Sequence, residues 1–107
     1  MANEHAIDHL FALIKSRNGG DAKRSYTAKL LKSGVAECAK KFGEESVETA
    51  LAAVGGNKKE LTSESADALY HLLVLWAACG IAPKDVYAAL AAREGRSGLA
   101  EKAARKR

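Results

Sequence analysis

The sequence contains little that would build a β-sheet or a cysteine scaffold. Its 107 residues include two cysteines, one proline and only 6% aromatic residues. The cysteines, Cys38 and Cys79, form no Cys-x-x-Cys pair and no Cys/His constellation, which argues against a structural zinc site or a disulfide framework. The scarcity of proline and aromatic residues favours helices over a β-sandwich, so we expect an all-α fold.

Long apolar runs and a basic N-terminal region are also missing. The chain begins MANEHAIDHLFALI, which is polar and acidic at first and has no apolar run of the length that membrane insertion needs. We therefore expect a cytoplasmic location and no membrane partner. The length fits one domain over residues 1–107.

The charge is moderately basic. Lys and Arg number 17 against 13 Asp and Glu, a formal net charge of +4, which fits a nucleic acid, a polyanionic substrate or solubility alone. Much of the excess lies in a basic C-terminal tail, residues 95–107, which we expect to be solvated. A small basic nucleic-acid-binding protein is therefore one hypothesis. No recognition-helix motif or aromatic platform supports it, and we predict no nucleic-acid partner.

Periodicity and capping residues predict the first two helices. Apolar residues recur at spacings of three and four over residues 7–14, and RNGGD ends this helix. A short helix or structured loop follows in SYTAKLLKSG, with Ser25 as the N-cap and Gly34 as the stop.

A longer helix is predicted over residues 35–54, ended by Gly55 and Gly56. Gly43 inside it indicates either the close approach of a ligand or helix, or tolerated slack. Its apolar residues trace one face: Val35, Ala39, Phe42, Val47, Ala50, Leu51 and Val54.

The next helix is capped by Asn57, has Glu60 at the capping-box position and ends at Gly80. Beyond Asp67 it is apolar almost all round, so it should be central to the fold or bury a face in a homodimer. Pro83 begins the last helix. We expect an antiparallel bundle of four to five helices.

Two pairs of carboxylates occupy neighbouring predicted helices. Glu45 and Glu48 share one helix face, and so do Glu64 and Asp67, because residues three apart lie close together on a helix. The short GGNKK turn makes the helices antiparallel neighbours, so the four carboxylates should converge. Convergence is unfavourable unless the acids are protonated or neutralised by a cation. All-oxygen ligands favour Mg²⁺ or Mn²⁺ over zinc.

Each pair could instead lie on a solvated helix face, which is the common role of such pairs, although the second pair borders an apolar surface. His71 follows Asp67 by one turn and is either a hydrogen-bond partner of a ligating carboxylate or a satisfied core histidine. Lys41 precedes Glu45 by one turn and either contacts phosphate or pairs with Glu45.

Several segments of the chain resemble one family closely. SYTAKLL, KKFGEESVETALAA, ELTSESADALYHLLVLWAACGI, DVYAAL and SGLAEKAARK are similar to the phosphoribosyl-ATP pyrophosphohydrolase family, in the MazG-like all-α nucleotide pyrophosphohydrolase superfamily. The resemblance spans nearly the whole chain. It implies hydrolysis of 1-(5-phosphoribosyl)-ATP to 1-(5-phosphoribosyl)-AMP and pyrophosphate, the second step of histidine biosynthesis, with Mg²⁺, or Mn²⁺ as a substitute, on a homodimeric helical bundle.

The resemblance also implies roles for particular residues. The metal ligands would be Glu45, Glu48, Glu64 and Asp67. Glu44 and Glu48 are both candidates for the general base. The expected substrate contacts are Lys41, Ser25, Tyr26 and Thr27. The nearest alternative function is a housekeeping nucleoside triphosphate pyrophosphohydrolase with the same metal site and another base pocket.

Overall fold

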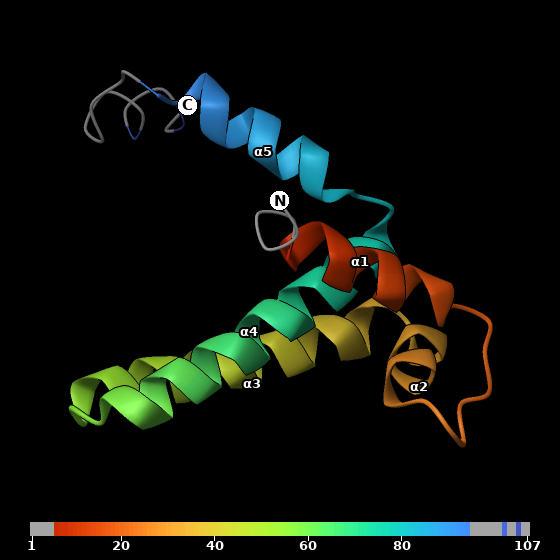
Figure 1. Ribbon diagram of the computed structural model, residues 1–107, viewed down its shortest axis with the longest axis horizontal. Helices are drawn as coiled ribbons and strands as arrows, with labels where there is room; N and C mark the ends of the chain where they lie inside the picture. The colour runs from red at the N-terminus through yellow and green to blue at the C-terminus, as the bar shows by residue number, and fades with distance from the viewer. Residues whose placement is uncertain (1–5, 95–101, 103–104, 106–107) are drawn as a thin grey trace.

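The computed structural model describes residues 6–94, 102 and 105, and this part of the chain is helical with no strand. The helices are α1 (Ala6–Ser16), α2 (Tyr26–Ser33), α3 (Val35–Val54), α4 (Lys58–Cys79) and α5 (Pro83–Ala92) (Figure 1). The predicted all-α fold is confirmed. The basic C-terminal tail lies outside the described residues, apart from the exposed Lys102 and Arg105.

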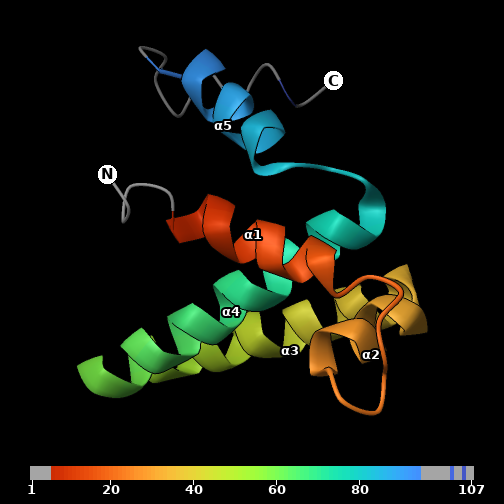
Figure 2. The same cartoon turned by 45° about the vertical axis from the view of Figure 1, so that its right-hand side comes forward.

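The two longest helices form a hairpin. α3 and α4 lie side by side along their lengths in both Figure 1 and Figure 2. The turn between them contains Gly56 at a φ of 78°, a conformation that glycine adopts without strain. Asn57 then caps α4, because its side-chain oxygen accepts the backbone N–H of Glu60 at 3.0 Å. The predicted turn and cap are confirmed, and they bring the two acid pairs onto adjacent helices.

The core lies at the end of this hairpin that is far from the turn. There α1 packs on α4, and α2 packs on both α3 and α4 (Figure 2). Leu73 and Val74 of α4 are completely buried, so α4 is central, as its apolar sequence predicts. The other buried residues of the core cluster are Phe11, Ile14, Leu30 and Cys38.

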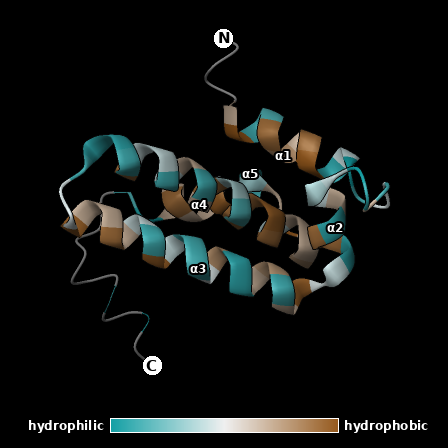
Figure 3. Cartoon of the chain, turned by 90° about the horizontal axis from the view of Figure 1, so that it is seen from below, coloured by the Kyte–Doolittle hydropathy of each residue, from teal (hydrophilic) through white to brown (hydrophobic). Residues whose placement is uncertain are grey.

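The apolar face predicted on α3 does not point into this core. Val47, Leu51 and Val54 are 58%, 64% and 87% exposed. Figure 3 shows hydrophilic stretches interspersed along both long helices. A Cβ at Gly43 would meet nothing within 4 Å, so no neighbouring helix in the described part of the chain approaches it closely. The less exposed face of α3 carries polar residues among apolar ones: Cys38, Phe42, Glu45, Thr49 and Ala52.

α5 stands apart from the hairpin and packs mainly on α1 (Figure 1). The Tyr87 hydroxyl donates to Asp8 Oδ1 at 3.1 Å across this contact. Pro83 begins α5, as predicted, and the Asp85 carboxylate accepts the backbone N–H of Ala82 at 2.9 Å. Within the described residues no single helix has the length and apolarity to cross a membrane. α4 and α5 reach that threshold only together, across a bend of 104°.

Candidate metal centre and its surroundings

Three carboxylates meet between α3 and α4. Glu45 and Glu48 of α3 and Glu64 of α4 each place one oxygen within 4.8 Å of the other two. Glu45 and Glu64 are half-buried, whereas Glu48 is exposed. We call these three residues the acidic cluster. The structure brings together three of the four carboxylates that the sequence predicted to converge.

Asp67 is the fourth predicted carboxylate, and it lies outside this group. It follows Glu64 by one turn of α4 and is exposed. Its charge nevertheless reaches the cluster, because it contributes to raising the pKa of Glu64.

Burial and neighbouring charges act together on Glu64. Burial raises the pKa of its carboxyl, and the charges of Glu48 and Glu45 raise it further. Its Oε1 atom is buried and has no hydrogen-bond partner within the described part of the chain. A buried carboxylate oxygen without a partner is costly unless a cation or a proton satisfies it. The cluster therefore fits a hard divalent cation, whose preferred ligands are carboxylate oxygens.

Thr49 ties the two helices together at the cluster. Its hydroxyl lies 2.8 Å from the backbone carbonyl oxygen of Glu45 and 3.1 Å from that of Glu64. The first contact lies within α3 and the second crosses to α4. One side chain therefore fixes the position of Glu45 along α3 relative to that of Glu64 along α4. Sequence reasoning missed this residue. The only signal was a hydroxyl one turn after a candidate ligand, which is common in helices.

A hollow of about 250 Å³ opens beside the cluster. Glu60 contributes to its wall, although the sequence indicated only a capping role for this residue. The hollow, which we call the acidic hollow, combines carboxylate and apolar walls and is lined by Glu48, Leu51, Ala52, Glu60 and Glu64.

Lys41 and Glu44 pair with each other at the edge of the cluster. Lys41 Nζ lies 3.6 Å from Glu44 Oε1, so the ion pair expected with Glu45 forms with Glu44 instead. The two side chains are 35% and 46% exposed, and such a pair contributes little to stability. This arrangement leaves the Glu45 carboxylate directed into the cluster.

The predicted substrate-binding segment at the start of α2 already makes structural contacts. Ser25 caps α2 as predicted, since its Oγ accepts the backbone N–H of Ala28 at 3.0 Å. The hydroxyl of Thr27 is hydrogen-bonded to that of Tyr70. Tyr26 is 52% exposed, and its ring stacks on that of Tyr70 with centroids 6.4 Å apart. Of the three residues, Tyr26 offers the most open surface for a ligand.

His71 connects this segment to α4. It is 7% exposed, and its Nδ1 has no hydrogen-bond partner among the described residues. Neither expected role, a bond to a ligating carboxylate or a satisfied core histidine, is therefore met at Nδ1. The ring instead contacts Tyr70 and Tyr26 edge-on, with centroids 4.9 and 6.1 Å away. Because His71 follows Asp67 by one turn, these contacts bring the start of α2 close to the acidic residues of α4.

Comparison with known proteins agrees with this arrangement. Residues 7–94 match the family described as phosphoribosyl-ATP pyrophosphohydrolase. A phosphoribosyl-ATP pyrophosphatase of Parvibaculum lavamentivorans is 60% identical over 104 residues, which cover 97% of this chain and 95% of that protein. The enzyme of the same name from Azospirillum brasilense is 55% identical over 100 residues, covering 94% of this chain and 90% of that protein. One from Paramagnetospirillum magneticum is 54% identical over 99 residues, with coverage of 92% and 91%. With five helices over residues 6–92, an acidic cluster between the two longest of them and similarity along nearly its whole length, this chain belongs to the phosphoribosyl-ATP pyrophosphohydrolase family.

Proposed function

We propose that this protein hydrolyses 1-(5-phosphoribosyl)-ATP to 1-(5-phosphoribosyl)-AMP and pyrophosphate, as the second step of histidine biosynthesis. Family membership and the names of the relatives support the reaction. The observation that carries it is the acidic cluster, because a triphosphate needs a cation between itself and three carboxylates. A cytoplasmic location, which the sequence favours, is part of the proposal.

The cation in this proposal is Mg²⁺, with Mn²⁺ as a substitute. Glu45, Glu48 and Glu64 would hold it, with Asp67 as a further ligand from the same helix as Glu64. When bound, it would neutralise phosphate charge and polarise the phosphoryl oxygens. The side chains themselves hold the site in place: Glu45 and Glu48 lie one turn apart on a single helix, and Thr49 fixes their height relative to Glu64. Such fixed positioning is what a phosphoryl-transfer site contributes most.

Proton transfer and leaving-group charge require further residues. A water molecule that attacks the chain of phosphates must lose a proton, and a carboxylate within hydrogen-bond reach can accept it. Glu48, a member of the acidic cluster, and Glu44, which pairs with Lys41, are the proposed bases. Lys41 could exchange Glu44 for a phosphate oxygen and so stabilise the departing pyrophosphate. Its pair with Glu44 is long and partly exposed, so breaking that pair costs little free energy.

A homodimer is also part of the proposal. Several large apolar side chains on three helices remain exposed in the single chain, among them Val47, Leu51, Leu69, Tyr87 and Leu90. A second copy that covered part of this surface would remove it from water, which is favourable by about 25 cal/mol per Å² of apolar area.

Hydrolysis of ordinary nucleoside triphosphates is the alternative, because the acidic cluster would serve either substrate. The test is pyrophosphate release from phosphoribosyl-ATP compared with ATP and dNTPs, with and without Mg²⁺. We expect turnover of phosphoribosyl-ATP that requires the cation. Faster turnover of ATP or a dNTP would replace the proposal with the alternative.

A further inference from the structure

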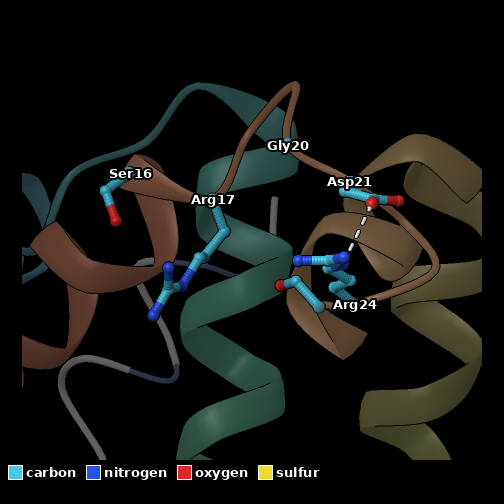
Figure 4. Close-up of a pocket in the computed structure, with 6 residues that line it drawn as sticks. Ser16, Arg17, Gly20, Asp21 and Arg24 are labelled. Atoms are coloured by element: carbon cyan, nitrogen blue, oxygen red, sulfur yellow. Dashed lines mark ion pairs between the residues drawn. The ribbon is translucent and has the colours of Figure 1, made fainter.

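A second hollow lies between the end of α1 and the start of α2. Its volume is about 350 Å³, and it shares no residue with the acidic hollow. Figure 4 shows Arg17 on one side of it and Arg24 on the other. We call it the arginine hollow, and its lining residues are Ser16, Arg17, Gly20, Asp21, Arg24 and Ser25.

Both arginines of this hollow are available to an anion. Arg17 has no ion-pair partner among the residues that the structure describes, and in Figure 4 its guanidinium points away from Asp21. Arg24 Nε lies 3.8 Å from Asp21 Oδ2, and the Arg24 side chain is 89% exposed. A long, exposed pair of this kind is weak, so a phosphate can compete with Asp21 for the guanidinium.

Asp21 is the one carboxylate of the hollow, and it has a local structural role. Its Oδ1 accepts the backbone N–H of Lys23 at 2.9 Å, and its backbone carbonyl accepts N–H groups from Arg24 and Ser25, both at 3.0 Å. These bonds hold the loop that presents Arg24. With two guanidinium groups against one carboxylate, the lining carries a net positive charge.

The backbone shapes the hollow for a small anion. A Cβ at Gly20 would meet the carbonyl oxygen of Arg17 at 3.0 Å, so only glycine fits here without a shift, and the wall has no side chain at this point. The eight-residue helix α2 begins at the opposite wall, capped by Ser25. Its N-terminal end adds a partial positive charge to that of the arginines.

A short series of residues links this hollow to the metal centre. Ser25 lines it, and the next residue, Tyr26, contacts the ring of His71. His71 is seven residues from Glu64, which is about 10 Å along α4. A ligand with phosphate groups at both ends could therefore bind both sites, with its middle beside the exposed ring of Tyr26.

We propose that Arg17 and Arg24 bind a phosphate monoester, the 5-phosphate of the phosphoribosyl group, while the triphosphate of the same molecule binds at the acidic cluster. This inference rests on the proposed function and adds a specificity determinant to it. ATP has no phosphate at that end, so the arginine hollow would distinguish phosphoribosyl-ATP from ATP.

The first test uses Arg17→Met and Arg24→Met. Each variant removes a charge-assisted contact that is made equally in the bound substrate and the transition state. We therefore expect the KM for phosphoribosyl-ATP to rise by roughly tenfold to 100-fold, with kcat within about threefold of the parent. Lys32→Met is the matched control, because it removes the same charge from the exposed last turn of α2. KM values equal to that of the control would overturn the proposal.

The second test separates this site from the proposed reaction. Ribose 5-phosphate, inorganic phosphate and ribose are titrated calorimetrically into the parent protein and both arginine variants without Mg²⁺. We expect ribose 5-phosphate to bind the parent only, and ribose to bind none of them. Binding of ribose 5-phosphate by a protein that fails to hydrolyse phosphoribosyl-ATP would support the hollow and refute the reaction. Hydrolysis with no such binding and unchanged KM values would refute the hollow alone. If inorganic phosphate binds as tightly as ribose 5-phosphate and the KM values do not change, the hollow binds free phosphate and the substrate assignment is wrong.

Discussion

The Thr49 hydroxyl on α3 lies within donating distance of two carbonyl oxygens, that of Glu45 in its own helix at 2.8 Å and that of Glu64 on α4 at 3.1 Å. Two residues of the acidic cluster are thus joined through one side chain. The geometry of the cluster depends on this link between helices as well as on the spacing of acids along each helix.

Replacing Thr49 with valine tests the link. Thr49→Val keeps the shape and removes the hydroxyl, so we expect the free energy of unfolding to fall by about 0.5–1.5 kcal/mol and Mg²⁺ binding to weaken several-fold. Thr62→Val is the control, because its hydroxyl bonds only within α4, to the carbonyl oxygen of Lys58 at 2.9 Å. Equal Mg²⁺ affinities in the two variants, measured by calorimetry, would show that Thr49 does not position the ligands.

Removing the cation should abolish activity. We expect no pyrophosphate release after exhaustive EDTA treatment, and recovery with Mg²⁺ or Mn²⁺, because the three carboxylates and the triphosphate repel one another without it. Mg²⁺ at 100 times its dissociation constant should also stabilise the fold by about 2.7 kcal/mol, which a thermal melt would register. Full turnover in EDTA would be incompatible with a metal centre.

Neutral amides in place of the carboxylates should separate activity from stability. Glu64→Gln removes the acid whose pKa is raised by burial and by its neighbours, so the metal-free protein should melt at the same or a higher temperature. Glu48→Gln and Asp67→Asn should likewise leave the melting temperature of the metal-free protein unchanged or raise it. The rise should be smaller for Asp67→Asn, because Asp67 lies outside the cluster. Pyrophosphate release should nevertheless fall by at least about 100-fold in each.

The control for these amides is Glu37→Gln, which removes a carboxylate from the first turn of α3, outside the cluster. Its turnover should stay near that of the parent. A cluster variant with reduced melting temperature and near-normal turnover would identify its carboxylate as structural.

Association should depend on the exposed apolar surface and not on the core. We expect sedimentation at micromolar concentration to show a homodimer. Leu69→Lys, which places a charge at a side chain that is 46% exposed, should shift the monomer–dimer equilibrium toward the monomer. Leu73→Ala is the contrast, because Leu73 is fully buried within one chain. It should cost about 2–5 kcal/mol of folding free energy. A parent protein that sediments as a monomer would refute the dimer.

The two cysteines should differ in reactivity. Cys38 is 1% exposed, its thiol donates to the Leu30 carbonyl oxygen at 3.3 Å, and its pKa is raised, chiefly by burial, whereas Cys79 is exposed. Native protein should therefore incorporate one iodoacetamide, at Cys79, and Cys79→Ser should incorporate almost none until denatured. The Cys38 thiol ionises at a lower pH in the unfolded chain than in the folded protein. The free energy of unfolding should therefore fall as the pH rises above about 9. Rapid native labelling of Cys38 would contradict its burial.

Local signals in the sequence were sufficient for the four longer helices, whereas they allowed either a short helix or a structured loop for α2. Ser25 and Asn57 cap α2 and α4 as predicted, because a cap depends on residues only three positions away. The antiparallel pairing of α3 and α4 followed from the short turn between them, and it brought Glu64 to Glu45 and Glu48.

Features that depend on distant residues could not be read in this way. The apolar residues of α3 were expected on one face, yet Val47, Leu51 and Val54 point to solvent, because α3 turns Glu45 and Thr49 toward α4. The arginine hollow requires the end of α1 and the cap of α2 to line one space, together with a loop whose sequence has no phosphate-binding motif.

The α3–α4 hairpin has a further consequence, which concerns the order of folding. Every candidate metal ligand lies on two helices that follow each other in the chain, and the bond that links them spans only 15 residues. Closing so short a loop costs little chain entropy, and contacts this local form early. We therefore expect amide hydrogens of α3 and α4 near Thr49 to gain protection early in refolding, before α5 docks on α1. The cation would then bind an intermediate as well as the finished enzyme, and Mg²⁺ would accelerate folding in addition to stabilising its product.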